Sequence, residues 1–107
     1  VVQGNVPIRR YRRCPMDTVA GVSRMGEFLF ENSVDISEGG MKLDVNGNYR
    51  VGEQIDVFFF VPSGRFVRAT CEVLYLLEVN ERRQIGVKFM QPSDKCTGAI
   101  REYVAQV

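Results

Sequence analysis

Apolar and polar residues alternate along most of the chain, and this period of two is typical of half-buried β-strands. The longest example is the segment 67–77, where one face is apolar and consists of Val67, Ala69, Cys71, Val73, Tyr75 and Leu77. Shorter segments repeat the pattern, the first two less regularly: residues 16–22, 28–30, 41–45, 54–61 and 85–89. Together these segments predict six short strands.

Turn-forming residues separate the predicted strands. Clusters of asparagine, glycine, proline and serine lie at residues 46–48, 62–64 and around 80–82, where neighbouring strands should reverse. No segment between the strands is long enough for a helical crossover, so antiparallel pairing is expected, and closure into a barrel would leave no free edge. The sequence therefore predicts a mainly β fold, a six-stranded antiparallel β-barrel.

The C-terminal segment follows a helical period instead. After Pro92, either Ser93 or Asp94 can cap a helix. Helical spacing then relates the apolar residues Cys96, Ala99, Ile100, Tyr103 and Val104. Gly98 costs such a helix about 1 kcal/mol relative to alanine. We therefore expect a short helix, beginning at about residue 93, that closes the barrel.

Charge is distributed unevenly, although the net charge is only +1. Residues 1–24 carry a net charge of +4, and residues 25–107 carry −3. Four of the arginines lie between Pro7 and Pro15, which disfavour a helix there. We therefore divide the chain into a flexible basic arm, residues 1–13, and a barrel domain with its helix, residues 14–107.

Several classes of chemistry are disfavoured by composition. The chain has no histidine, its carboxylates are scattered, and its three cysteines are irregularly spaced, which fits neither a disulfide framework nor a zinc site. We expect no enzymatic activity and no metal. No apolar run approaches the ~18 residues of a membrane span and no signal peptide is evident, so we expect a cytoplasmic domain. A chain that begins with Val rather than Met is compatible with a domain of a longer protein.

The basic arm offers guanidinium groups at a defined spacing. In an extended chain, Arg9 and Arg13 face the same side about 13 Å apart, with Tyr11 between them. Guanidinium binds phosphate bidentately, pairs with guanine O6 and N7, and stacks on a base. Without a second motif, such a cluster is more often a solvated basic tail.

A second motif follows in the segment VDISEGGMKL, residues 34–43. Asp35 and Ser37 lie two residues apart and point the same way in a strand. The carboxylate can accept hydrogen bonds from the N1–H and N2–H₂ edge of guanine, and the hydroxyl can donate to phosphate. Gly39 and Gly40 permit a positive φ or a close approach of a ligand. By itself, however, this pattern is also that of a common turn.

Together the two motifs resemble the PilZ domain, a bacterial receptor module for the second messenger cyclic di-GMP. The resemblance rests on Arg9-x-x-x-Arg13, on Asp35-x-Ser37-x-x-Gly40, and on the later segment IGVKF at residues 85–89, and it covers residues 8–103. It implies a barrel with the arm folded over one outer face.

The resemblance also implies residue roles and a function. Arg9 and Arg13 would hold guanine and phosphate with help from Arg10, while Asp35, Ser37, Gly39 and Gly40 would form the floor. Such a module signals by ordering its arm toward a partner protein or fused domain, in motility, polysaccharide secretion or virulence.

Two other functions remain open at this stage. One is a PilZ-like protein-interaction module without nucleotide binding. The other is a small barrel that binds single-stranded nucleic acid, for which Phe58 and Phe60 are the candidate stacking residues.

Overall fold

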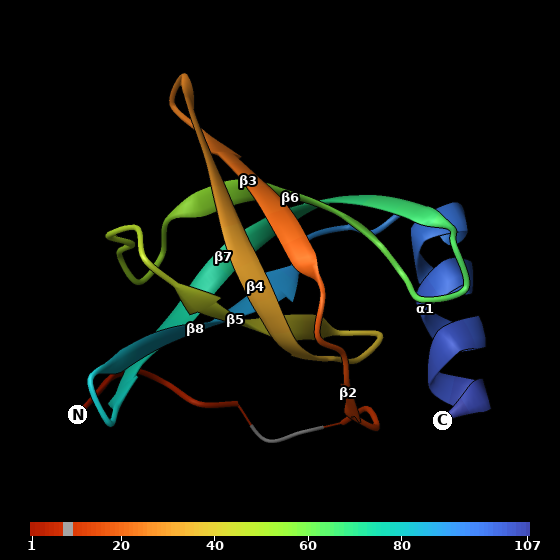
Figure 1. Ribbon diagram of the computed structural model, residues 1–107, viewed down its shortest axis with the longest axis horizontal. Coiled ribbons are helices and arrows are strands. Elements are labelled where there is room, and N and C mark those ends of the chain that lie inside the picture. Colours follow the sequence, from red (N-terminus) through yellow and green to blue (C-terminus); the bar gives the residue numbers. More distant parts are fainter. Residues whose placement is uncertain (8–9) are drawn as a thin grey trace.

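The computed structural model describes residues 1–7 and 10–107, and shows a β-barrel closed at one end by a helix (Figure 1). Its elements are, in chain order, β1 (Val2–Gly4), β2 (Cys14–Pro15), β3 (Val19–Arg24), β4 (Glu27–Ile36), β5 (Gly40–Val45), β6 (Gln54–Phe60), β7 (Phe66–Val79), β8 (Arg82–Phe89) and α1 (Asp94–Gln106).

Six of these strands form a closed antiparallel ring. The order around the barrel is β3, β4, β5, β8, β7 and β6, and β6 pairs with β3 again. This confirms the six-stranded barrel expected from the alternation of residues. Two-residue turns join β3 to β4 and β7 to β8, and positive φ angles at Met25, Asn80 and Glu81 match the twist of such hairpins.

The N-terminal segment adds two short strands that the sequence analysis did not predict. β1 pairs with residues 75–77 of β7, and β2 pairs with residues 35–36 at the end of β4. Ladders of two or three residues are too short to show an alternation of apolar and polar positions. The arm that we assigned to residues 1–13 is thus paired with the barrel through β1. β2 begins directly after the last residue of this arm.

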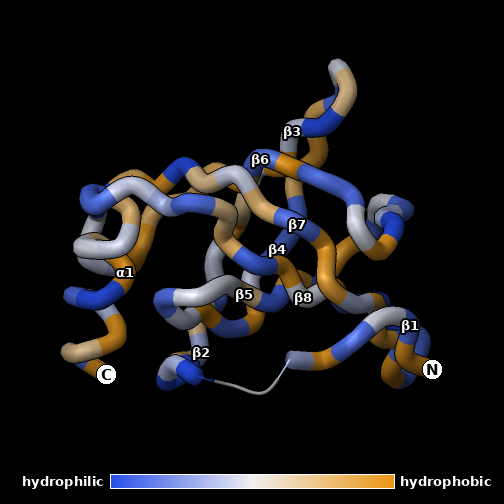
Figure 2. The backbone as a smooth tube through the Cα atoms, turned by 180° about the vertical axis from the view of Figure 1, so that it is seen from behind, coloured by the Kyte–Doolittle hydropathy of each residue, from blue (hydrophilic) through white to orange (hydrophobic). Residues whose placement is uncertain are grey.

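The core confirms most of the predicted apolar faces. Val67, Val73 and Val87 are at most 3% exposed, and the alternation of hydropathy along the strands is visible in Figure 2. Tyr75 and Leu77, however, do not continue the inward face of β7. The register shifts between Val73 and Tyr75, and this β-bulge reverses which residues point inward.

The consequence of the bulge is visible in its neighbours. Leu76, rather than Leu77, packs against the core, whereas Tyr75 is buried without belonging to the core cluster. Ile85 and Val87 point inward, so Gly86 between them faces outward, and a Cβ there would lie 2.0 Å from the Tyr75 ring. Tyr75 therefore covers Gly86 on the outside of the barrel.

Helix α1 begins at a serine cap and closes one end of the barrel. The Cys96 amide donates to the Ser93 hydroxyl over 3.1 Å. The helix buries the apolar residues Cys96, Ala99, Ile100 and Val104. Its 13 residues confirm the predicted position and start. Of the helices in the described part of the chain, none is long and apolar enough to cross a membrane.

A buried carboxylate fixes the loop after β5. Glu31 is 2% exposed and accepts hydrogen bonds from the amides of Asn46 and Gly47, at 2.9 and 3.2 Å, and from the Tyr49 hydroxyl at 2.7 Å. Burial, followed by the hydrogen bond to Glu31, raises the pKa of Tyr49 above its ordinary value. The guanidinium of Arg24 lies 4.3 Å from the centre of the Tyr49 ring and adds a cation–π contact.

Candidate functional site

Strand β2 brings the basic arm next to the end of β4. Cys14 pairs with Ile36, and Pro15 pairs with Asp35. Directly before this ladder, Arg13 Nη1 lies 2.9 Å from Asp35 Oδ1, with the two side chains 16% and 17% exposed. One arginine of the first motif and the carboxylate of the second motif therefore form a half-buried ion pair.

The second motif continues into a tight turn. The Ser37 amide donates to the Gly40 carbonyl over 2.8 Å, and the Ser37 hydroxyl donates to the same oxygen over 3.4 Å. The Gly39 amide donates to the Ser37 hydroxyl over 3.2 Å. Ser37 is only 7% exposed, so its hydroxyl organises the turn between β4 and β5.

The two glycines of this turn allow close packing. A Cβ at Gly40 would lie 2.0 Å from the Val87 carbonyl oxygen, so only glycine permits β5 to approach β8 at this point. A Cβ at Gly39 would lie 2.9 Å from the ring of Tyr11, which therefore packs directly on the turn. Neither glycine has a positive φ, and the close contacts that the structure shows at both are with other parts of the chain.

A cavity of about 370 Å³ lies between the arm, this turn and the outer side of β7 and β8. Both views of the backbone show the N-terminal segment running beneath β5 and β8 (Figures 1 and 2). The cavity is lined by Pro7, Arg10, Tyr11, Arg13, Ser37, Glu38, Gly39, Gly40, Leu74, Tyr75, Gly86, Val87, Lys88, Phe89 and Pro92. It combines aromatic rings with several cations.

The one carboxylate that lines the cavity is held by helix α1. Arg101 donates from Nε and Nη2 to Glu38 Oε1, over 3.0 and 2.8 Å. These hydrogen bonds, and the charge of Glu38, raise the pKa of Arg101. Among the described residues no ion pair involves Arg10 or Lys88. The cavity therefore has cations available for an anionic ligand.

Helix α1 also contacts β2 directly. The Tyr103 hydroxyl donates to the Pro15 carbonyl over 2.7 Å, and the Cys14 thiol lies 3.8 Å from the Val104 carbonyl. The strand that positions Arg13 is thus fixed on one side by β4 and on the other by the helix.

Five of the seven predicted site residues line this cavity: Arg10, Arg13, Ser37, Gly39 and Gly40. Asp35 is attached to the site through Arg13 and is not itself among the lining residues. Arg9 lies outside the described residues.

Other cavity residues were not identified as site residues from the sequence. Lys88 could have been found from the sequence, since it lies in the segment IGVKF that contributes to the resemblance. Tyr75 could not have been found in this way, because only the bulge in β7 turns its side chain outward.

Neither the cysteines nor the carboxylates assemble into a reactive centre in the part of the chain that the structure describes. Cys14, Cys71 and Cys96 are buried as free thiols. Burial raises the pKa of Cys71 and of Cys96, which suppresses their thiolates. Over the same residues, no group of histidine, cysteine, aspartate or glutamate could hold a metal ion.

A family model described as the PilZ domain matches residues 7–106, nearly the whole chain. The chain belongs to the PilZ domain family. This confirms the resemblance inferred from the two motifs. No curated protein sequence matches this PilZ domain.

Solved structures of other PilZ proteins share the fold. The Bacillus subtilis inhibitor of motility, MotI/DgrA, is similar with a TM-score of 0.85 at 17% identity, over 94% of this chain and 51% of that chain. YcgR of Escherichia coli in complex with c-di-GMP is similar with a TM-score of 0.75 at 15% identity, over 92% of this chain and 45% of that chain. The PilZ domain of CeSA, from a cellulose-synthesizing bacterium, is similar with a TM-score of 0.64 at 10% identity, over 89% of this chain and 96% of that chain. The chain spans about half the length of the first two.

Proposed function

We propose that this PilZ domain is a non-catalytic receptor that binds cyclic di-GMP in the cavity between the arm and the turn at residues 37–40. The observation that carries the proposal is the 2.9 Å ion pair between Arg13 and Asp35, which joins the two motifs at the edge of that cavity. Membership of a family of cyclic di-GMP receptors supports it, as does the complex of the similar protein YcgR with c-di-GMP.

The side chains around the cavity match the chemistry of this ligand. Cyclic di-GMP has two phosphates and two guanines. Arg10, Arg13 and Lys88 supply charge for the phosphates, and the ring of Tyr11, which is half exposed, supplies a flat surface for a base.

Asp35 has two contributions in this proposal. It orients the Arg13 guanidinium before the ligand arrives, and it presents an acceptor for the N–H edge of guanine. Arg9 occupies the other arginine position of the motif, and we assign it a phosphate or guanine contact on that basis alone.

The proposed receptor produces its effect through another protein or a fused domain. Histidine, the commonest general base of enzymes, does not occur in the chain. We propose that the bound arm contacts a partner protein or a fused domain in the cytoplasm, where such a messenger acts. Motility is one candidate output, because a structurally similar protein is an inhibitor of motility.

Isothermal titration calorimetry tests the proposal directly. Wild-type protein should bind cyclic di-GMP in preference to GTP, cyclic GMP and the linear dinucleotide. Arg13→Ala should weaken binding by about 1.5–3 kcal/mol, the loss of charge-assisted hydrogen bonds, and should lower the melting temperature modestly because it leaves the Asp35 carboxylate without its partner. Arg82→Ala removes an exposed arginine that pairs with Asp44 outside the cavity, and should bind as wild type does.

Two results would contradict this proposal. Folded wild-type protein that gives no heat with cyclic di-GMP is not a receptor for it, and the interaction-module alternative would then be favoured. An Arg13→Ala variant that melts far below wild type without ligand would show that Arg13 is mainly structural.

Asp35→Ala gives a prediction of unusual sign. Removing a carboxylate next to a dianionic ligand should strengthen binding if the arm acts only as a positive field. We expect weaker binding by about 1–2 kcal/mol instead, because Arg13 loses its orienting partner and guanine loses an acceptor. Titration of Asp44→Ala controls for the loss of a carboxylate elsewhere, and tighter binding by Asp35→Ala would favour a nonspecific basic arm.

The backbone of the arm between β1 and the Arg13–Asp35 pair is expected to become ordered on binding. Its arginines repel one another without an anion, and ligand phosphates would remove that repulsion. In hydrogen exchange, amides of residues 5–13 should be nearly unprotected in the free protein and clearly protected with cyclic di-GMP, while residues 66–76 of β7 stay protected in both states. Equal protection of the arm with and without ligand would mean that the site is preformed.

A further inference from the structure

Glu38 brings a negative charge into a cavity that is otherwise lined by cations. It lies in the turn between β4 and β5, and its side chain is 24% exposed. The other charged residues that line the described part of the cavity are Arg10, Arg13 and Lys88. In a cavity of about 370 Å³ these charges act on a ligand over distances comparable with the Debye length, about 8 Å at physiological salt. An uncompensated carboxylate at this position would therefore repel a phosphate.

The guanidinium of Arg101 compensates this charge from helix α1. Its Nε and Nη2 atoms both donate to Glu38 Oε1. Figure 1 shows the turn between β4 and β5 extending toward α1, where the two side chains meet. Two N–H groups on one oxygen neutralise the carboxylate and also fix its orientation. Glu38 is therefore held toward the helix at the edge of the cavity.

The packing of α1 fixes the position of Arg101. Ile100, the residue before it, is fully buried, and Val104 is 9% exposed. The hydrogen bond from Tyr103 to the Pro15 carbonyl holds the same part of the helix against β2. The Arg101 side chain itself is 68% exposed and is not part of the core. The helix thus sets where this side chain starts, and Glu38 sets where it ends.

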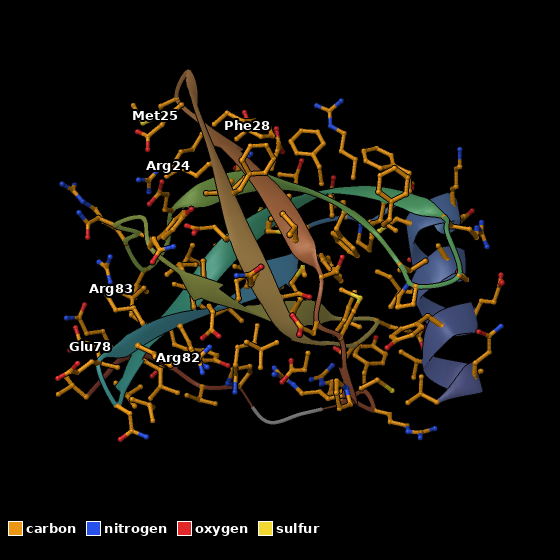
Figure 3. All side chains as sticks on the ribbon, in the orientation of Figure 1. Arg24, Met25, Phe28, Glu78, Arg82 and Arg83 are labelled. Carbon is orange, nitrogen blue, oxygen red and sulfur yellow. The ribbon has the colours of Figure 1, made fainter. Side chains whose placement is uncertain are left out.

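A second ion pair of nearly the same exposure shows what distinguishes this one. Arg82 and Asp44 are 69% and 20% exposed, against 68% and 24% for Arg101 and Glu38. Neither Arg82 nor Asp44 lines the cavity, and Figure 3 shows Arg82 on the side of the barrel away from α1. Exposed ion pairs of this kind contribute little to stability. The distinctive feature of the Arg101–Glu38 pair is that its carboxylate lines the cavity.

We propose that Arg101 is a positioning residue of the receptor. It holds the Glu38 carboxylate against α1, where this charge neither repels the phosphates of the ligand nor pairs with the cations that bind them. Without Arg101, Glu38 would compete with the ligand for Arg10 and Lys88. This inference rests on the proposed function, since it concerns cyclic di-GMP bound in this cavity.

A double-mutant cycle, measured by calorimetry with cyclic di-GMP, tests this role. Arg101→Met removes the charge and the donors but keeps an unbranched helix-forming side chain, and should raise the dissociation constant about tenfold. Glu38→Gln alone should change the constant by less than about twofold, because Arg101 already compensates the carboxylate. The double variant should bind within about twofold of wild type. A purely structural contribution of Arg101 would not be repaired by the second substitution.

The second ion pair supplies the matched controls. Arg82→Met and Asp44→Asn make the same kinds of change outside the cavity, and should leave the dissociation constant unchanged. Arg101→Lys keeps the charge but loses the two-point geometry, so its binding should lie between wild type and Arg101→Met. Because the Arg101 side chain is exposed, none of its variants should lower the melting temperature by more than about 2 °C.

The Arg101 Nε–H group gives a measurement that does not depend on affinity. In nitrogen–proton correlation spectra of the free wild type, this proton should exchange slowly with water, because it is hydrogen-bonded to Glu38. In Glu38→Gln it should exchange rapidly. Saturation with cyclic di-GMP should leave it slow, because the pair persists in the proposed complex. Rapid exchange in the complex would show that the ligand breaks the pair, and would contradict the proposal.

Failure of this inference can be told apart from failure of the proposed function. Wild-type protein that does not bind cyclic di-GMP would contradict both. If wild type binds and Arg101→Met binds equally well, only the positioning role of Arg101 is wrong. Loss of binding in Glu38→Gln would show that Glu38 contacts the ligand itself. Weak binding by the double variant would show that Arg101 does so, and either result overturns the proposal.

Discussion

Gly40→Ala is expected to lower the free energy of unfolding by about 3 kcal/mol, because the added methyl group has no space. Its Cβ would lie 2.0 Å from the Val87 carbonyl oxygen and 3.2 Å from the Lys88 Cα, and both are backbone atoms. β5 and β8 would therefore have to separate at the rim of the cavity. We also expect cyclic di-GMP binding to be lost at temperatures where the variant is still folded.

Gly98→Ala is the matched control for this change. A Cβ at Gly98 meets nothing within 4 Å, and the residue lies inside helix α1. The same chemical substitution should therefore raise stability by about 1 kcal/mol, through helix propensity alone. Urea denaturation of both variants measures the two effects. A Gly40→Ala protein as stable as wild type would show that the β5–β8 pairing is more adaptable than described above.

Glu31→Ala is expected to destabilise the barrel by about 3 kcal/mol. The substitution removes the acceptor of three hydrogen bonds, one of them from the buried hydroxyl of Tyr49, and leaves a cavity of carboxylate size. Chemical denaturation monitored by tyrosine fluorescence measures the loss.

Two further variants separate the contributions to this cluster. Glu31→Gln keeps the side-chain volume and one acceptor oxygen, so it should lower the free energy of unfolding by less than Glu31→Ala does. Tyr49→Phe removes one hydrogen bond and leaves the two amide contacts of Glu31, and should cost about 1 kcal/mol. If Glu31→Ala were no worse than Tyr49→Phe, the two amides would be satisfied by water instead.

The barrel could be predicted from the sequence because its strands follow the alternation closely and its turns contain turn-forming residues. The prediction failed where the chain departs from that regular period. The bulge after Val73 moves Tyr75 out of the core, and nothing in the order of residues 73–77 marks it. β1 and β2 were missed because each is held by a ladder with a distant strand rather than by its own pattern.

The site was predictable to the extent that its residues are fixed by motifs. Arg13 and Asp35 were identified separately, and the structure shows that they pair. The contributions of Tyr11, Lys88 and Arg101 depend on contacts between segments far apart in the sequence. Such contacts come from the fold, so local spacing could not reveal them.

The way in which the barrel closes has a consequence for folding kinetics. Four of the ladders join strands that follow one another in the chain, whereas β3–β6 and β5–β8 join strands distant in sequence. Loop-closure entropy opposes these two joins, so they should form last. Gly40 and Lys88 pair at one end of the β5–β8 ladder, on the rim of the cavity. A ligand bound there would mainly slow unfolding, with little effect on the folding rate, and would therefore prolong the lifetime of the folded protein.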